Sequence, residues 1–197
     1  MGEYHPIKFL DRLEGNNHIL LLYDNQEYAD LIIARYFLNG LEKEESCIFF
    51  TADKPEIIEK RLSAQGIDVD YYKKKNSLRI YRIEMSDANK LDTRGTLKSL
   101  RKEATRGMKP PYRFVGRTIT DIESKQGMQL GLALERTGHE HFGEFDNSQM
   151  CYYDISRIEK SRRDEWISGL LKSHHQVIYA SEQDKAVAFE TFLLDEE

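Results

Sequence analysis

Short apolar runs alternate along the chain with longer segments in which apolar residues recur at helical spacing. The first run, residues 19–22, is uninterrupted, which is typical of a strand buried on both faces of a sheet. The apolar runs predict six strands, at residues 19–22, 46–52, 78–83, 112–119, 150–155 and 176–180. Helical spacing predicts helices at residues 5–14, 26–41, 53–65, 94–108, 121 or 124 to 142, 161–172 and 181–193. This alternation predicts a three-layer α/β/α sandwich with a mostly parallel central sheet.

The turn after the first strand, Tyr23-Asp24-Asn25, is where this architecture would place a ligand, because ligands bind beyond the carboxyl ends of parallel strands. The turn lacks the glycines, lysine and hydroxyl residue of a phosphate-binding loop. Asp24 and Glu27 also fit a capping box at the start of the following helix. A local capping role and a ligand role both stay open.

The turns after the other strands would gather at the same edge of the sheet. They contain Thr51-Ala52-Asp53, Glu84-Met85-Ser86, Arg117-Thr118, Thr120-Asp121 and Tyr153-Asp154. This polar, aromatic rim of mixed charge suits a small organic ligand better than a nucleoside triphosphate. The predicted ligand-binding residues are Tyr23, Asp24, Asn25, Thr51, Arg117, Tyr153 and Asp154. In the structural alternative, each acid caps a helix and each tyrosine fills the core.

The composition indicates a globular protein. The chain has 197 residues and a formal net charge of −5, and we expect one domain over residues 1–197. Residues 1–17 would form an N-terminal helix and lead-in, and residues 195–197 an acidic, mobile tail. Without a signal peptide or a membrane-length apolar run, the sequence predicts a cytoplasmic protein with no membrane partner. Cys47 and Cys151 lie in strand-like runs and are predicted to be buried free thiols.

Residues 94–117 carry eight basic side chains against one acidic side chain. A nucleic-acid partner is not expected, because the whole chain is acidic and no aromatic residues interleave with these charges. A solvated helix or a protein interface explains the basic segment better.

The histidines do not form a recognisable metal motif in sequence. His139 and His141 would point about 200° apart on a helix, so a surface location is predicted for both. His174-His175 fits a helix end, and His18 precedes a strand at its amino end, away from the expected ligand edge. Neither G-x-S-x-G nor a cysteine close to a histidine in sequence is present. We therefore expect no enzyme activity, no cofactor and no metal site.

Several segments resemble the MEDS family, the methanogen/methylotroph DcmR-type sensory domain. The similar segments are residues 18–24, Gly40-Leu41 with Glu44-Glu45, Leu62 with Gly66-Ile67-Asp68, residues 151–154, and Leu170-Leu171 with His174. The resemblance covers roughly residues 15–181 and departs most over residues 86–121. It implies a RecA/KaiC-like core that has lost its phosphate loop. It also implies a sensory role in signalling or transcriptional regulation, with hydrocarbon-type or one-carbon-derived ligands.

These observations favour a non-enzymatic domain that senses a small organic ligand and acts through a signalling or regulatory protein partner. Two alternatives stay open: a degenerate RecA/KaiC-like nucleotide-binding protein or ATPase relative, and an interaction scaffold. A homo-oligomer also stays open.

The strand order implied by the resemblance puts the fourth strand beside the first. Arg117 is therefore expected to pair with Asp24 or Asp154 and to turn toward an anionic ligand group, unless it simply faces solvent. Gly116 would permit the close approach of another group.

Overall fold

A seven-stranded sheet forms the centre of the computed structural model, which describes residues 5–83, 93–117, 121–144, 146–182 and 185–191. The strands are β1 (His18–Tyr23), β2 (Ser46–Thr51), β3 (Leu78–Arg82), β4 (Tyr112–Val115), β5 (Asn147–Asp154), β6 (Gln176–Ala180) and β7 (Val187–Glu190). Their order is β3-β2-β4-β5-β1-β6-β7, and every neighbouring pair is parallel except β6 with β7. The predicted mostly parallel sheet is confirmed.

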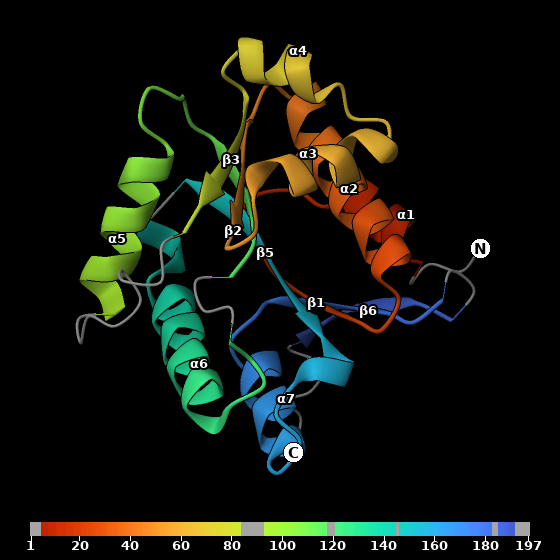
Figure 1. The fold of residues 1–197 in the computed structure, drawn as a ribbon, viewed down its shortest axis with the longest axis vertical. Coiled ribbons are helices and arrows are strands. Elements are labelled where there is room, and N and C mark those ends of the chain that lie inside the picture. Colours follow the sequence, from red (N-terminus) through yellow and green to blue (C-terminus); the bar gives the residue numbers. More distant parts are fainter. Residues whose placement is uncertain (1–4, 84–92, 118–120, 145, 183–184, 192–197) are drawn as a thin grey trace.

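Helices cover both faces of the sheet (Figure 1). They are α1 (Pro6–Arg12), α2 (Gln26–Glu42), α3 (Pro55–Ala64), α4 (Val69–Lys74), α5 (Thr93–Ala104), α6 (Lys125–Glu140) and α7 (Arg163–Leu171), with short 3₁₀ turns at Phe142–Glu144 and Ile155–Arg157. Ile19 and Leu21 of β1 pack with the side chains of α2, whereas Leu20 and Leu22 pack with those of α6 and α7. This division of one apolar strand between two cores explains why its sequence shows no polar alternation.

Two elements differ from the sequence prediction. No helix was predicted between residues 65 and 78, but this segment contains α4, which begins where the Asp68 side chain accepts a hydrogen bond from the Tyr71 amide. The predicted helix at 181–193 is wrong where it is described, because residues 187–190 form β7 and pair with β6. Ala188 is fully buried while Val187 is 43% exposed, as expected when neighbouring side chains point to opposite faces.

The predicted neighbour relation between the first and fourth strands is also wrong. β5 lies between them and is hydrogen-bonded to both, with His18 opposite Gln149 and Val115 opposite Met150. Strand adjacency is set by pairing across the sheet, which the order of elements along the chain does not specify. The residue after β4 therefore lies beside β5 instead of β1.

Two predicted helix caps shift by one residue. Asn25 caps α2, since its Oδ1 accepts a hydrogen bond from the Tyr28 amide at 2.9 Å, whereas Asp24 precedes the cap. Lys54 occupies the N-cap position of α3 without a side-chain hydrogen bond, so Asp53 does not cap that helix. Ser124 caps α6, as one of the two predicted starts requires.

The segment 94–117 is not a uniformly solvated basic face. Arg101 and Arg113 are 6% exposed each. Arg101 donates a hydrogen bond to Gln149, and Arg113 forms two with Glu45. Sequence spacing places these arginines among exposed cations, but the elements packed around them supply polar partners inside the protein.

Candidate functional site

A cleft of about 310 Å³ opens at the carboxyl ends of β2 and β5, beside the chain that leaves β4. Its lining residues come from those strand ends and from the segments that follow them: Phe50, Thr51, Ala52, Asp53, Arg117, Asp121, Tyr152 and Arg157. Thr51 and Arg117 were predicted as ligand-binding residues. The cleft therefore lies at the predicted edge of the sheet and combines two guanidinium groups, two carboxylates and aromatic walls.

Arg117 follows Gly116, whose backbone lies close against β2 just after β4 ends. Gly116 has φ of 132°, and a Cβ atom there would lie 2.4 Å from the Phe50 carbonyl oxygen. The predicted close approach at Gly116 is thus a backbone contact with β2. Arg117 Nη1 donates a hydrogen bond to the Tyr152 carbonyl at 2.6 Å, and its guanidinium lies 5.4 Å from the Tyr152 ring centroid.

The predicted aspartate partners of Arg117 accept other hydrogen bonds. Asp24 accepts one from the Tyr179 hydroxyl at 3.3 Å, and Asp154 accepts one from the Ser156 amide at 2.9 Å. In the structure, Arg117 contacts Tyr152, and its guanidinium also lies 5.3 Å from the Tyr153 ring centroid.

The remaining predicted residues have local roles or point elsewhere. The Tyr23 hydroxyl donates to Gln26 at 3.1 Å, and burial raises its pKa to about 12. Asn25 caps α2. Tyr153 is buried on the opposite face of β5 from the Tyr152 side chain. The predicted rim residues at positions 84–86, 118 and 120 lie outside the described residues.

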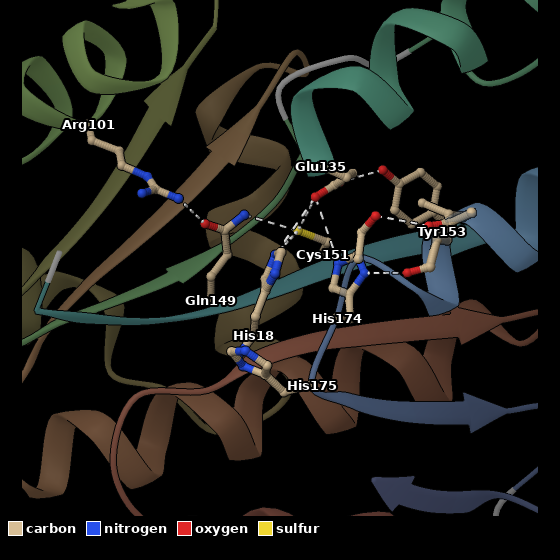
Figure 2. Close-up of polar contacts among 11 residues, drawn as sticks. His18, Arg101, Glu135, Gln149, Cys151, Tyr153, His174 and His175 are labelled. Atoms are coloured by element: carbon tan, nitrogen blue, oxygen red, sulfur yellow. Dashed lines mark hydrogen bonds and ion pairs between the residues drawn. The ribbon is translucent and has the colours of Figure 1, made fainter. Parts of the chain in front are cut away.

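A second group of polar side chains lies inside the protein, between the sheet and α6. It consists of His18, Glu135, Cys151 and His174, and we call it the buried cluster. Their Nε2, Oε2, Sγ and Nε2 atoms approach one another closely, and possible ligand atoms from all four lie within 4.8 Å of one another. Figure 2 shows these side chains converging from β1, α6, β5 and the turn after α7.

Within the buried cluster, the closest contact joins Cys151 Sγ to Glu135 Oε2 at 3.3 Å. His18 Nε2 lies 3.6 Å from Cys151 Sγ and 3.8 Å from Glu135 Oε2. His174 Nε2 lies 3.7 Å from Glu135 Oε2. All four residues are at most 7% exposed, so the buried cluster is almost completely shielded from bulk solvent.

Surrounding groups orient the buried cluster. The Tyr153 hydroxyl donates to Glu135 Oε1 at 2.5 Å, and Gln149 Nε2 donates to Cys151 Sγ at 3.0 Å. Arg101 in turn donates to Gln149 Oε1 at 2.7 Å. His174 Nδ1 lies 2.7 Å from the Leu170 carbonyl, which only accepts hydrogen bonds, so Nδ1 carries the proton. Its Nε2 then presents a lone pair to the buried cluster.

Burial sets the protonation of the buried cluster. Desolvation lowers the pKa of His18 well below its ordinary value and also lowers the pKa of His174, so both imidazoles are held neutral. Desolvation raises the pKa of the Cys151 thiol, with a further contribution from the Glu135 carboxylate. The arrangement therefore presents neutral nitrogen donors beside a thiol and a carboxylate.

Sequence reasoning did not find the buried cluster, because its members are far apart along the chain and each looks ordinary locally. The predicted free thiols are confirmed, since Cys47 and Cys151 are both buried and unbridged. The prediction that His139 lies on the surface is only partly met, because its ring lies 4.8 Å from that of His175. One signal was available: His18 heads an apolar run, where a fully buried polar residue needs partners.

The fold defines a class of protein. The structure is similar to a KaiC-like protein, PH0186, of the archaeon Pyrococcus horikoshii OT3, with a TM-score of 0.61 and 13% identity over 90% of this chain and 80% of that one. A second protein of that organism, PH0250, has a TM-score of 0.61 and 11% identity over 93% of this chain and 91% of that one. The chain therefore has a RecA/KaiC-like α/β fold.

The sequence itself identifies the family. The model of the MEDS family, "MEthanogen/methylotroph, DcmR Sensory domain", matches residues 17–187, and the chain belongs to this family. No curated protein sequence matches the chain. Among the helices that the structure describes, none combines the length and apolar character needed to cross a membrane.

Proposed function

We propose that this chain is a non-enzymatic sensory domain that binds a small organic molecule carrying an anionic group in the cleft at the strand ends. Membership of a sensory-domain family supports the sensory role. The ligand-bound domain would then act on a signalling or transcription-regulating protein partner.

The observation that carries the proposal is the composition of the cleft. Its volume of about 310 Å³ is at the lower end of the range of roughly 300–1,000 Å³ for small-molecule sites. Arg117 and Arg157 place guanidinium groups, which match a carboxylate, in the cleft. There Arg157 Nε also donates to Glu123, and the Tyr152 ring supplies an apolar surface. Such a site favours a molecule with one charged end and a short organic body.

The start of α2 argues against a phosphate ligand at the place where many nucleotide-binding folds hold one. Phosphate binding there uses free amides at the helix N-terminus. In this chain the Tyr28 amide already donates to the Asn25 side chain, and Asp24 adds negative charge beside it. The nucleotide-binding alternative is therefore the less favoured one, although the KaiC-like fold keeps it worth testing.

A thermal-shift screen of small organic acids tests the proposal. A ligand that binds only the folded state stabilises that state by about 2.7 kcal/mol at a ligand concentration of 100 times the Kd. The midpoint temperature of thermal unfolding must therefore rise. We expect the shift to be largely lost in Arg117→Ala when each variant is compared with its own ligand-free midpoint. Arg94→Ala, which removes an exposed guanidinium on α5, is the control and should respond as the wild type does.

The outcome that contradicts the proposal is a screen without any shift, or a shift that survives in Arg117→Ala. Isothermal titration with ATP and magnesium is run in parallel. Micromolar binding of ATP would favour the nucleotide-binding alternative.

A further inference from the structure

We propose that His18, Glu135, Cys151 and His174 bind a divalent transition-metal ion, with zinc as the expected metal. This site lies in the interior, distinct from the cleft at the strand ends. It does not depend on the identity of the ligand sensed there.

The spacing of the donor atoms fits a tetrahedral ion. Zinc bonds of about 2.0–2.3 Å to nitrogen, oxygen and sulfur give tetrahedral edges of roughly 3.3–3.7 Å. Four of the six contacts within the buried cluster measure 3.3, 3.6, 3.7 and 3.8 Å, and the donor atoms all lie within 4.8 Å of one another. An ion at the centre of the four donor atoms would therefore need only small movements of these side chains.

The hydrogen bonds also leave the correct atoms available. His174 Nε2 is fully buried and has no hydrogen-bond partner among the described residues, while Nδ1 is used by the Leu170 carbonyl. A metal-bound histidine has this same pattern, with the distal nitrogen on the metal and the other N–H on a backbone carbonyl. A buried nitrogen without a hydrogen-bond partner calls for an explanation, and a bound ion supplies one.

The groups around the donors are those that support metal ligands. The Tyr153 hydroxyl holds Glu135 Oε1 and so directs Oε2 toward the histidines and Cys151. Gln149 donates to the Cys151 sulfur, which favours its thiolate form, and Arg101 fixes the Gln149 amide. Outer partners of this kind orient ligands and raise metal affinity.

Charge balance favours a divalent ion. Two neutral imidazoles, one thiolate and one carboxylate carry a total charge of −2, which a divalent ion neutralises in a place where net charge is costly. Binding converts the Cys151 thiol to a metal thiolate and releases its proton to solvent. Imidazole and thiolate donors select zinc-class metals, whereas calcium and magnesium require oxygen donors.

One member of the buried cluster borders a cavity. A small cavity of about 10 Å³, close to the space of one water molecule, lies between α5 and α6. Arg101, Glu135, Gln149 and Tyr153 are among its lining residues. The Glu135 carboxylate therefore borders a small space between these two helices.

Titration of the purified, metal-stripped full chain with Co²⁺ tests the proposal directly. Tetrahedral cobalt bound to a thiolate gives intense visible bands and a sulfur-to-cobalt charge-transfer band. We expect these bands to saturate at about one ion per chain and to disappear when Zn²⁺ is added. Zinc should also raise the thermal midpoint.

Variants separate the four donors from their surroundings. Cys151→Ser should abolish the charge-transfer band and weaken cobalt binding by more than about 100-fold. Cys47→Ser removes the other buried thiol, on the opposite face of the sheet, and should leave both unchanged. Tyr153→Phe should keep the band but lower affinity by about 10–100-fold, as loss of an outer partner does.

The wild-type titration decides the matter even if a variant fails to fold. Absence of saturable cobalt bands in the wild type would overturn the proposal. Loss of the charge-transfer band in Cys47→Ser, with retention in Cys151→Ser, would overturn it equally.

Discussion

Arg113 carries a charge into the core at the second residue of β4. Its side chain is 7% exposed and forms a two-point contact with Glu45, at 2.6 and 3.0 Å, together with a hydrogen bond to the Tyr36 carbonyl at 2.9 Å. Gly40 makes room for it, because a Cβ there would lie 2.5 Å from Arg113 Nε. The guanidinium is thus enclosed by α2 and by the turn that leads into β2.

Replacement of Arg113 by alanine should lower the free energy of unfolding by about 3–5 kcal/mol, because Glu45 is left as an uncompensated, mostly buried carboxylate. Urea denaturation measures the change. The control is Arg94→Ala, which breaks an ion pair with side chains 57% and 41% exposed and should cost no more than about 1 kcal/mol. Equal losses of unfolding free energy in the two variants would show that Arg113 contributes no more to stability than an exposed ion pair does.

Glu159 provides a pH-dependent contribution to the stability of the folded state. Its carboxylate accepts a hydrogen bond from the Trp166 indole at 2.9 Å and one from the Ser161 amide at 2.9 Å, which lower its pKa to about 2. The pKa of a glutamate in an unfolded chain is about 4.3. Because the folded pKa is the lower one, the contribution is present above the unfolded value and is lost as pH falls toward the folded value.

We therefore expect the stability difference between wild type and Glu159→Gln to shrink as pH falls from about 5 to about 2. Urea midpoints measured across this range check the expectation. Trp166→Phe removes the main donor and should flatten the same pH dependence. A difference that stays constant over the range would show that Glu159 titrates normally in the folded state.

Among the elements, α2 depends on a side-chain cap that sequence spacing placed one residue too early. Asn25→Ala should lower the free energy of unfolding by about 1 kcal/mol, because the Tyr28 amide loses its partner. Asp24→Ala is the matched control and should change it by less than about 0.5 kcal/mol, since the only described hydrogen bond of the Asp24 side chain is an exposed one from Tyr179. Chemical denaturation distinguishes the two, and a larger loss for Asp24→Ala would restore the original assignment.

The elements that sequence reasoning predicted best are those with a strong local pattern. The apolar-rich runs found all six parallel strands, most clearly β1, whose residues after His18 are apolar because it is buried on both faces. β7 was mistaken for a helix because it is short and one-sided, and its pairing with β6 is a long-range property. The position of β5 between β4 and β1 could not be predicted from the sequence, because it too depends on long-range pairing.

The candidate sites divide in a similar way. The edge of the sheet was predicted from strand direction, and Thr51 and Arg117 do line a cleft there. Tyr153 was placed at that edge but points to the opposite face, toward Glu135. The buried cluster is assembled by four separate elements, so only the folded chain brings its donors together.

At the scale of the whole molecule, the sheet separates two polar regions with different surroundings. The cleft is open to solvent at the carboxyl ends of the strands, while the buried cluster lies under α6 on one face. β5 contributes to both, through Tyr152 in the cleft and Cys151 in the buried cluster. The central strand of the sheet is therefore the element that the two regions share.

Because β5 serves both regions, insertions and deletions within it should be poorly tolerated. Consecutive side chains on a strand face opposite sides, so one residue inserted or deleted between Gln149 and Cys151 would exchange the two faces of β5 downstream of it. Tyr152 would then be directed into the interior, and Cys151 toward the opposite core. Length variation should be tolerated in the turns around the sheet, whereas within β5 a single codon gained or lost would dismantle both regions at once.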